Sequence, residues 1–102
     1  MKLLAVTTLK EYSEKVTTIF RKAGIHVFSA TDIVGFKDDS DHNLIDSWFG
    51  MSDARFDSMF LFSFTEDEKA NSALEFIREY NLENPGDFPL RAFILPVENS
   101  SH

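Results

Sequence analysis

The chain has 102 residues, of which 43% are hydrophobic, including eleven Phe; it carries a formal net charge of −7 and has no cysteine. This length and composition predict one globular domain with a small core, and they exclude a disordered chain. The acidic charge disfavours a nucleic-acid partner, and the lack of Cys excludes disulfides and a Cys-based zinc site. No apolar run approaches the ~20 residues that span a bilayer. Residues 1–6 are too short for a signal peptide, so we expect a cytoplasmic protein without direct membrane insertion.

The chain opens with a predicted strand over residues 2–7 and an amphipathic helix over residues 9–23. Thr8 with Glu11 predicts a capping box at the start of this helix, and Ser13 is a rival N-cap. The apolar stripe that recurs at helical spacing consists of Tyr12, Val16, Ile19, Phe20 and Ala23.

Gly24 is expected to end this helix in the left-handed conformation. A second strand is predicted over residues 25–34, and Gly35 interrupts it. A loop of roughly twenty residues then runs from Gly35 to about Arg55. Loops of that length inside compact domains are usually functional or disordered.

The second half predicts a strand over residues 56–64 and a helix that runs to about Tyr80. Thr65 with Glu68 predicts a capping box at the start of this helix, where the acidic residues favour a helix N-terminus. The apolar stripe of the helix consists of Ala70, Ala73, Leu74, Ile77 and Tyr80.

A turn over residues 84–87 and a fourth strand over residues 90–97 complete the pattern, followed by a polar tail. The order β-α-β-β-α-β is the ferredoxin-like arrangement. We therefore expect an α+β fold in a single domain over residues 1–102, with one four-stranded antiparallel sheet and two helices on one of its faces.

The third and fourth strands are apolar on both faces. Phe60, Phe62 and Phe64 share one face of the third strand, and Met59 and Leu61 share the other. The fourth strand places Leu90, Ala92 and Ile94 on one face and Phe93, Leu95 and Val97 on the other. An antiparallel sheet with one wet face should alternate apolar and polar residues. Since the helices cover one face, the pattern predicts a homo-oligomer with sheets packed face to face; the alternative is that some of these Phe are simply exposed.

Several motifs resemble the PII nitrogen-regulatory signalling family. The helix end Gly24-Ile25 and the strand end Thr31-Asp32-Ile33-x-Gly35-Phe36 match that family in order and spacing. Trp48-Phe49-Gly50 and Ile94-Leu95-Pro96-Val97 resemble the related CutA copper-tolerance family. Both resemblances imply a ferredoxin-like homotrimer, and the first implies a signalling protein with an effector loop at about 35–55.

The PII resemblance also implies ATP or ADP binding in clefts between subunits. Two carboxylates, Asp38 and Asp39, follow the loop base where a triphosphate would lie, which argues against the usual ATP binding unless a cation intervenes. The turn before the last strand lacks the family's Lys, and the C-terminal arginines are absent. The cofactor therefore stays undetermined, with a divalent metal as one option. The candidate ligand-binding residues at the loop base and cleft are Gly35, Phe36, Lys37, Gly86 and Arg91.

The loop itself carries two candidate sites. Carboxylates and an imidazole suit a divalent cation, and the alternative is a solvated acidic loop. Aromatic and aliphatic side chains favour docking of a protein partner, and the alternative is that they fold back onto the trimer. The candidate metal ligands are Asp38, Asp39, Asp41 and His42, and the candidate partner-binding residues are Leu44, Ile45, Trp48 and Phe49.

No spacing marks a catalytic triad, a Walker motif or a dinucleotide fingerprint, so we expect no enzyme. His26 is interpreted as a structural residue rather than a ligand. The combined interpretation is a PII-like regulatory protein that senses a small molecule or ion at the subunit cleft. Its target, by resemblance a membrane transporter or a metabolic enzyme, would bind loop 35–55. The alternative is a CutA-like protein for metal binding or metal tolerance.

Overall fold

The computed structural model of the chain describes residues 1–36, 55–86 and 88–101. Within these residues the elements follow the predicted order. They are β1 (Lys2–Leu9), the 3-10 helix η1 (Lys10–Tyr12), α1 (Ser13–Lys22), β2 (Ser29–Phe36), β3 (Arg55–Thr65), α3 (Asp67–Glu83) and β4 (Arg91–Pro96). The strands form one antiparallel sheet in the order β2-β3-β1-β4. The predicted ferredoxin-like α+β arrangement is confirmed.

The first predicted capping box is wrong. Thr8 is buried and pairs with Met59 in the sheet, because β1 continues to Leu9. Because Thr8 belongs to the strand, it does not cap the helix, and α1 begins only at Ser13. Tyr12 is its N-cap, and no side chain caps the helix there.

The second predicted capping box fails for the same reason. Thr65 pairs with Lys2 at the end of β3, so α3 begins later, at Asp67. Glu66 is the N-cap residue, and no side-chain cap is formed. In both places the sheet extends by pairing into residues that local helix-capping rules assign to the next helix.

The predicted end of α1 is confirmed. Gly24 has φ +85°, the left-handed conformation that glycine adopts without steric cost. Its N–H donates to the Arg21 carbonyl at 3.0 Å, and the Ile25 N–H donates to the Phe20 carbonyl at 2.8 Å. This pair of bonds is the Schellman motif. Residues 25–28 then run as irregular chain, so β2 begins at Ser29 rather than at the predicted residue 25.

The core lies between the helices and one face of the sheet. Phe20 is fully buried, and its ring meets that of Phe28 edge to face at 5.2 Å between centroids. The Asn81 side chain ties α3 to the start of β4, since it donates to the Leu90 carbonyl and accepts from the Leu90 N–H, both at 2.9 Å. The buried core residues are Leu4, Val6, Val16, Ile19, Phe20, Ile25, Leu61, Ala73, Ile77 and Leu90.

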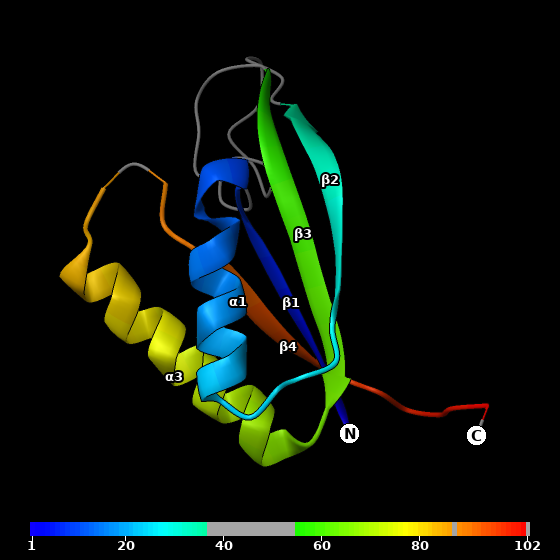
Figure 1. Cartoon of the computed structure of the whole chain (residues 1–102). Helices are drawn as coiled ribbons and strands as arrows, with labels where there is room; N and C mark the ends of the chain where they lie inside the picture. The colour runs from blue at the N-terminus through cyan, green and yellow to red at the C-terminus, as the bar shows by residue number, and fades with distance from the viewer. Residues whose placement is uncertain (37–54, 87, 102) are drawn as a thin grey trace.

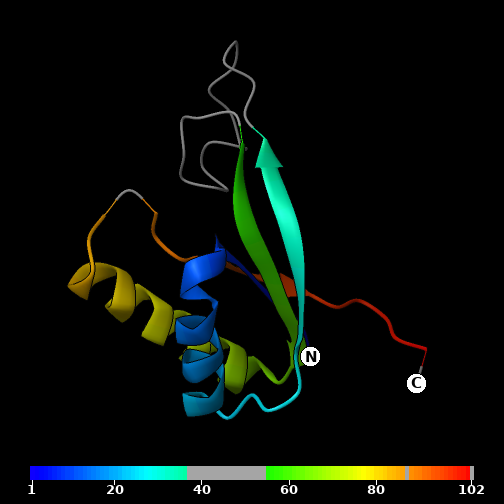
Figure 2. The same ribbon diagram turned by 45° about the horizontal axis from the view of Figure 1, so that its top comes forward.

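Figure 1 shows α1 and α3 on the same side of the sheet, and Figure 2 shows the same arrangement from another angle. The opposite face has neither of these helices against it in either view. After β4, residues 97–101 leave the body of the domain as an extended segment. β1, β3 and β4 therefore each have one face against the core and one face that the described part of the chain leaves open, whereas β2 contributes no residue to the buried core.

Candidate functional surface

The open face of the sheet is apolar over β1, β3 and β4, as the strand pattern predicts, whereas Ser29 and Thr31 of β2 lie on the same face opposite Phe62 and Phe60. In the register of β1 with β3, Leu3, Ala5 and Thr7 lie opposite Phe64, Phe62 and Phe60. In the register of β1 with β4, Leu3 and Ala5 lie opposite Leu95 and Phe93. Directly opposed residues in an antiparallel pair share a face. Six large apolar side chains therefore gather here, namely Leu3, Phe60, Phe62, Phe64, Phe93 and Leu95.

These side chains are only partly covered by their neighbours. Phe64, Phe93 and Leu95 are 57%, 41% and 44% exposed. The Phe60 and Phe62 rings stack at 5.3 Å between centroids, and Phe62 meets Phe64 edge to face at 6.2 Å. The small side chain of Ala5 on the adjacent strand is buried among them. Phe60, Phe62 and Phe64 therefore form a continuous row of aromatic rings on this face.

The residues predicted to line the ligand cleft fall at two opposite edges of the sheet. Gly35 lies on β2 opposite Phe56, and Arg91 lies on β4 opposite Thr7. Because β3 and β1 lie between these edges, β2 and β4 are three strand spacings apart, or about 14 Å. Gly86 is exposed in the connection between α3 and β4, and Phe36 ends β2. A single copy of the chain does not bring both halves of the predicted cleft together.

A small polar cavity lies beside Arg91. It has a volume of about 10 Å³, and Thr8 and Ser58 are among its lining residues. The Arg91 Nε and the Thr8 Oγ1 are both buried, and neither has a hydrogen-bond partner among the described residues. This space is about what one water molecule needs, so the cavity itself does not hold a larger ligand.

A larger cavity of about 410 Å³ lies at the other end of the sheet. His26 belongs to its lining and is exposed, so its imidazole is not part of the core. Sequence reasoning missed this cavity. The signal that could have found it is Gly24, because the turn at this residue ends α1 and the following residues 25–28 run as irregular chain before they join the sheet at Ser29. The lining residues are Met1, Gly24, Ile25, His26, Val27, Ser63, Phe64, Thr65, Glu66 and Lys69.

The remaining candidate residues lie outside the described part of the chain. This holds for Lys37 and for both loop sites: the metal ligands Asp38, Asp39, Asp41 and His42, and the partner-binding residues Leu44, Ile45, Trp48 and Phe49. Among the residues that the structure does describe, no group of three His, Asp or Glu side chains is placed to hold a metal ion. None of the described helices combines the length and apolar character that crossing a membrane requires.

Comparisons with known proteins identify the fold. No protein-family model matches the sequence, and no curated protein matches it. Among solved structures, a PII-like signalling protein from Thermus thermophilus superposes with a TM-score of 0.62 at 14% identity, over 91% of this chain and 82% of that one. A DUF3240 family protein from Shewanella baltica superposes with a TM-score of 0.65 at 13% identity, over 99% of this chain and 93% of that one. The chain therefore has a PII-like fold.

Proposed function

We propose that this protein is a PII-like regulatory protein, not an enzyme, that acts as a homotrimer in the cytoplasm. The observation that carries this proposal is the aromatic face on a sheet of PII-like fold. Apolar surface of this extent is stabilised when it is removed from water. A second copy of the same chain supplies a matching apolar face, and closed rings of identical subunits are a common outcome.

The proposed assembly would also bring together the two halves of the predicted ligand-binding cleft. Gly35 and Arg91 lie at opposite edges of one sheet, so two copies placed edge to edge would bring the Gly35 end of one copy beside the Arg91 and Gly86 end of the next. The unsatisfied Arg91 Nε supports a ligand that offers an acceptor oxygen. Phe36 and Lys37 would complete the cleft from the loop base.

The bound small molecule or ion would then bias the conformation of loop 35–55, and this loop would bind the target protein. Order–disorder switching of a loop is an established way to couple a ligand to a partner. The loop combines acidic residues, which favour solvation, with Trp48 and Phe49, which favour burial against a partner. The target would be a membrane transporter or a metabolic enzyme.

A thermal-shift screen of nucleotides and divalent cations tests the ligand part of this proposal. A ligand that binds the folded state raises the melting temperature as its concentration rises above its dissociation constant. We expect a small anionic ligand to stabilise the native protein and to lose this effect in Arg91→Gln. We expect ATP to bind weakly or not at all. Stabilisation by copper or zinc alone would favour metal handling of the CutA kind over the regulatory proposal.

Deletion of residues 38–52, joined by a short Gly-containing turn, tests the loop part. We expect the shortened protein to fold and assemble, since the cut removes no residue of β2 or β3. Capture of the native partner should be abolished. A shortened protein that fails to fold, or that keeps every partner, contradicts the assignment of target binding to this loop.

A further inference from the structure

The sheet has a gap at the end of β3. On one side, β1 pairs with β3 as far as Thr65, which lies opposite Lys2. On the other side, the pairing of β2 with β3 ends where Ser29 lies opposite Phe62. Residues 63–65 of β3 therefore have a described strand on one side only. An unpaired strand edge offers backbone N–H and C=O groups to another extended segment.

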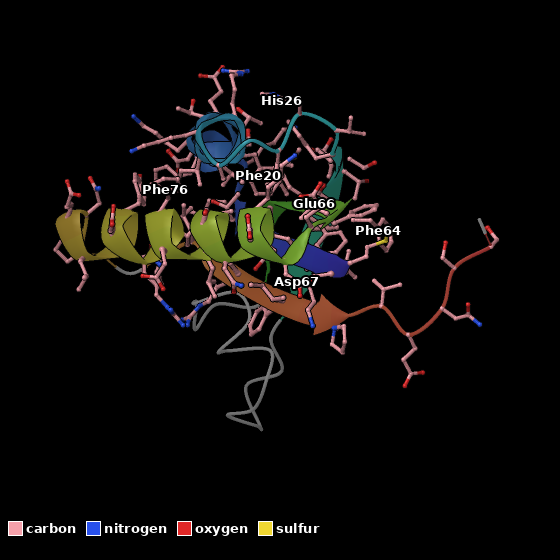
Figure 3. The ribbon with its side chains drawn as sticks, turned by 90° about the horizontal axis from the view of Figure 1, so that it is seen from below. Phe20, His26, Phe64, Glu66, Asp67 and Phe76 are labelled. Atoms are coloured by element: carbon pink, nitrogen blue, oxygen red, sulfur yellow. The ribbon has the colours of Figure 1, made fainter. Side chains whose placement is uncertain are left out.

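The cavity of about 410 Å³ occupies this gap. The chain at residues 25–28 bends away from β3, and the Ser63 hydroxyl donates a hydrogen bond to the Val27 carbonyl at 2.7 Å across the start of the gap. Figure 3 looks onto this end of the sheet, with His26, Phe64 and Glu66 labelled. The rim is apolar, because Val27 is 85% exposed and Phe64, at the end of the aromatic face, also lines it.

One charged side chain is held at this cavity by packing. The Lys69 stem lies beside Gly24, and a Cβ at that glycine would be 3.5 Å from the Lys69 Cε. Among the described residues Lys69 forms no ion pair. Glu66 and His26 also line the cavity. The site therefore combines an open strand edge, an apolar rim and an ammonium group that no described carboxylate neutralises.

A segment suited to this site leaves the same end of the domain. Pro96, the last residue of β4, pairs with Lys2, which on its other side pairs with Thr65. We call residues 97–101 the arm. In Figures 1 and 2 the arm extends on the side of the sheet away from both helices, where a copy covering the aromatic face would lie. The side chains from Glu98 to Ser101 are exposed, and Glu98 forms no ion pair among the described residues.

We propose that the arm of one copy adds as a short strand to the open β3 edge, residues 63–65, of the neighbouring copy. This inference rests on the proposed homo-oligomer, and it identifies the contact between neighbouring copies that closes the ring of subunits. Addition of an extended segment to a free edge gains backbone hydrogen bonds, and side chains beside the edge supply specificity. Glu98 provides the carboxylate that complements Lys69. Because the arm and the β3 edge are different surfaces, the contact is head to tail, and such contacts generate rings when the rotation closes.

Cross-linking tests this contact directly, because the native chain has no cysteine. Val27→Cys combined with Ser100→Cys places one thiol beside the β3 edge and one on the arm. We expect mild oxidation of the assembled protein to give disulfide-linked dimers and trimers on a non-reducing gel. The matched control is Ser72→Cys with Ser100→Cys, since Ser72 is exposed on α3 but does not line the cavity. The control should remain mainly monomeric.

Three results would overturn the proposal. If light scattering shows an intact oligomer and the 27/100 pair cross-links no more than the control, the arm docks elsewhere and the proposed assembly stands. A cross-link within one chain, seen as a faster-migrating monomer, would mean that the arm lies against the β3 edge of its own copy, which overturns the contact between copies. A native protein of protomer mass overturns both the arm contact and the proposed assembly.

A charge exchange provides a second test that does not depend on new thiols. Glu98→Lys should raise the dissociation constant of the oligomer by a factor of about 2 to 5, the range of an exposed ion pair. Adding Lys69→Glu should restore it. Glu83→Lys, which makes the same charge change at the far end of α3, should have no effect. Equal effects of Glu98→Lys and Glu83→Lys would contradict a specific contact between Glu98 and Lys69.

Discussion

Along β1 and β3 the two faces of the sheet are built from alternate residues of the same strands, and both carry mainly apolar side chains. On the helix-covered face, Leu4, Val6 and Leu61 are completely buried by α1 and α3. On the open face, Phe64 keeps 57% of its surface exposed, although it lies on the same strand as Leu61. Alternate residues of a strand lie on opposite faces of the sheet. Apolar residues on both faces therefore indicate that both faces must be covered, either by the same chain or by another.

The difference predicts two kinds of response to mutation. Substitutions on the covered face should lower the stability of each protomer, because the helices and the sheet are packed together there. Substitutions on the open face should change assembly and leave the protomer nearly unchanged.

Leu61→Ala should have the largest effect. The side chain is fully buried under the helices, so its truncation loses apolar burial and leaves a cavity, at a cost of about 2–5 kcal/mol in the free energy of unfolding. Urea denaturation followed by circular dichroism measures this loss. A loss of less than about 1 kcal/mol would show that the helices do not pack on this face as described.

Asn81→Ala should have the next largest effect on the covered side. It leaves both the N–H and the carbonyl of Leu90 without their side-chain partner, at a cost of about 1–3 kcal/mol. Asn84→Ala is the matched control, because Asn84 makes an exposed bond to the Tyr80 carbonyl. Equal losses for the two variants, measured by denaturation, would contradict an anchoring role for Asn81.

Gly24→Ala should lower the free energy of unfolding by about 1–2 kcal/mol, since an L side chain is strained at φ +85°. The added methyl group itself meets Lys69 at ordinary contact distance, so the cost comes from the backbone. Gly86→Ala provides the comparison, because nothing lies within 4 Å of a Cβ there. Thermal melting should separate the two variants by several degrees.

Leu95→Ser on the open face should have the smallest effect on the protomer. It is best measured in a Phe62→Asp background, where the proposed assembly is already dissociated. Leu95 is 44% exposed, so its replacement should cost less than about 1 kcal/mol in unfolding free energy. A loss as large as that of Leu61→Ala would mean that the open face is part of the protomer core.

The order of elements, the ferredoxin-like fold and the two-faced sheet were predictable from the sequence. Hydrophobic periodicity carries this information, and Gly24 marks a helix end by its conformational freedom. The starts of both helices were not predictable. Thr8 and Thr65 have the residue types of N-caps, but each lies in a strand whose length is set by pairing with distant residues.

The candidate site was predictable only in part. The sequence placed Gly35 and Arg91 at strand ends, and the structure adds that they lie at opposite edges of one sheet. The unpaired edge at residues 63–65 could not be predicted, because it arises where two strands of different length stop pairing. Such a feature depends on the register between strands, which the residues of one strand do not specify.

Light scattering of the native protein and of Phe62→Asp, at micromolar concentration, tests most directly whether a second copy covers the open face. The native protein should have about three times the protomer mass of 11.7 kDa. Phe62→Asp should have the protomer mass with an unchanged circular dichroism spectrum, because it places a charge on the apolar face without entering the helix-covered core. A native protein that is monodisperse at 11.7 kDa would contradict the account.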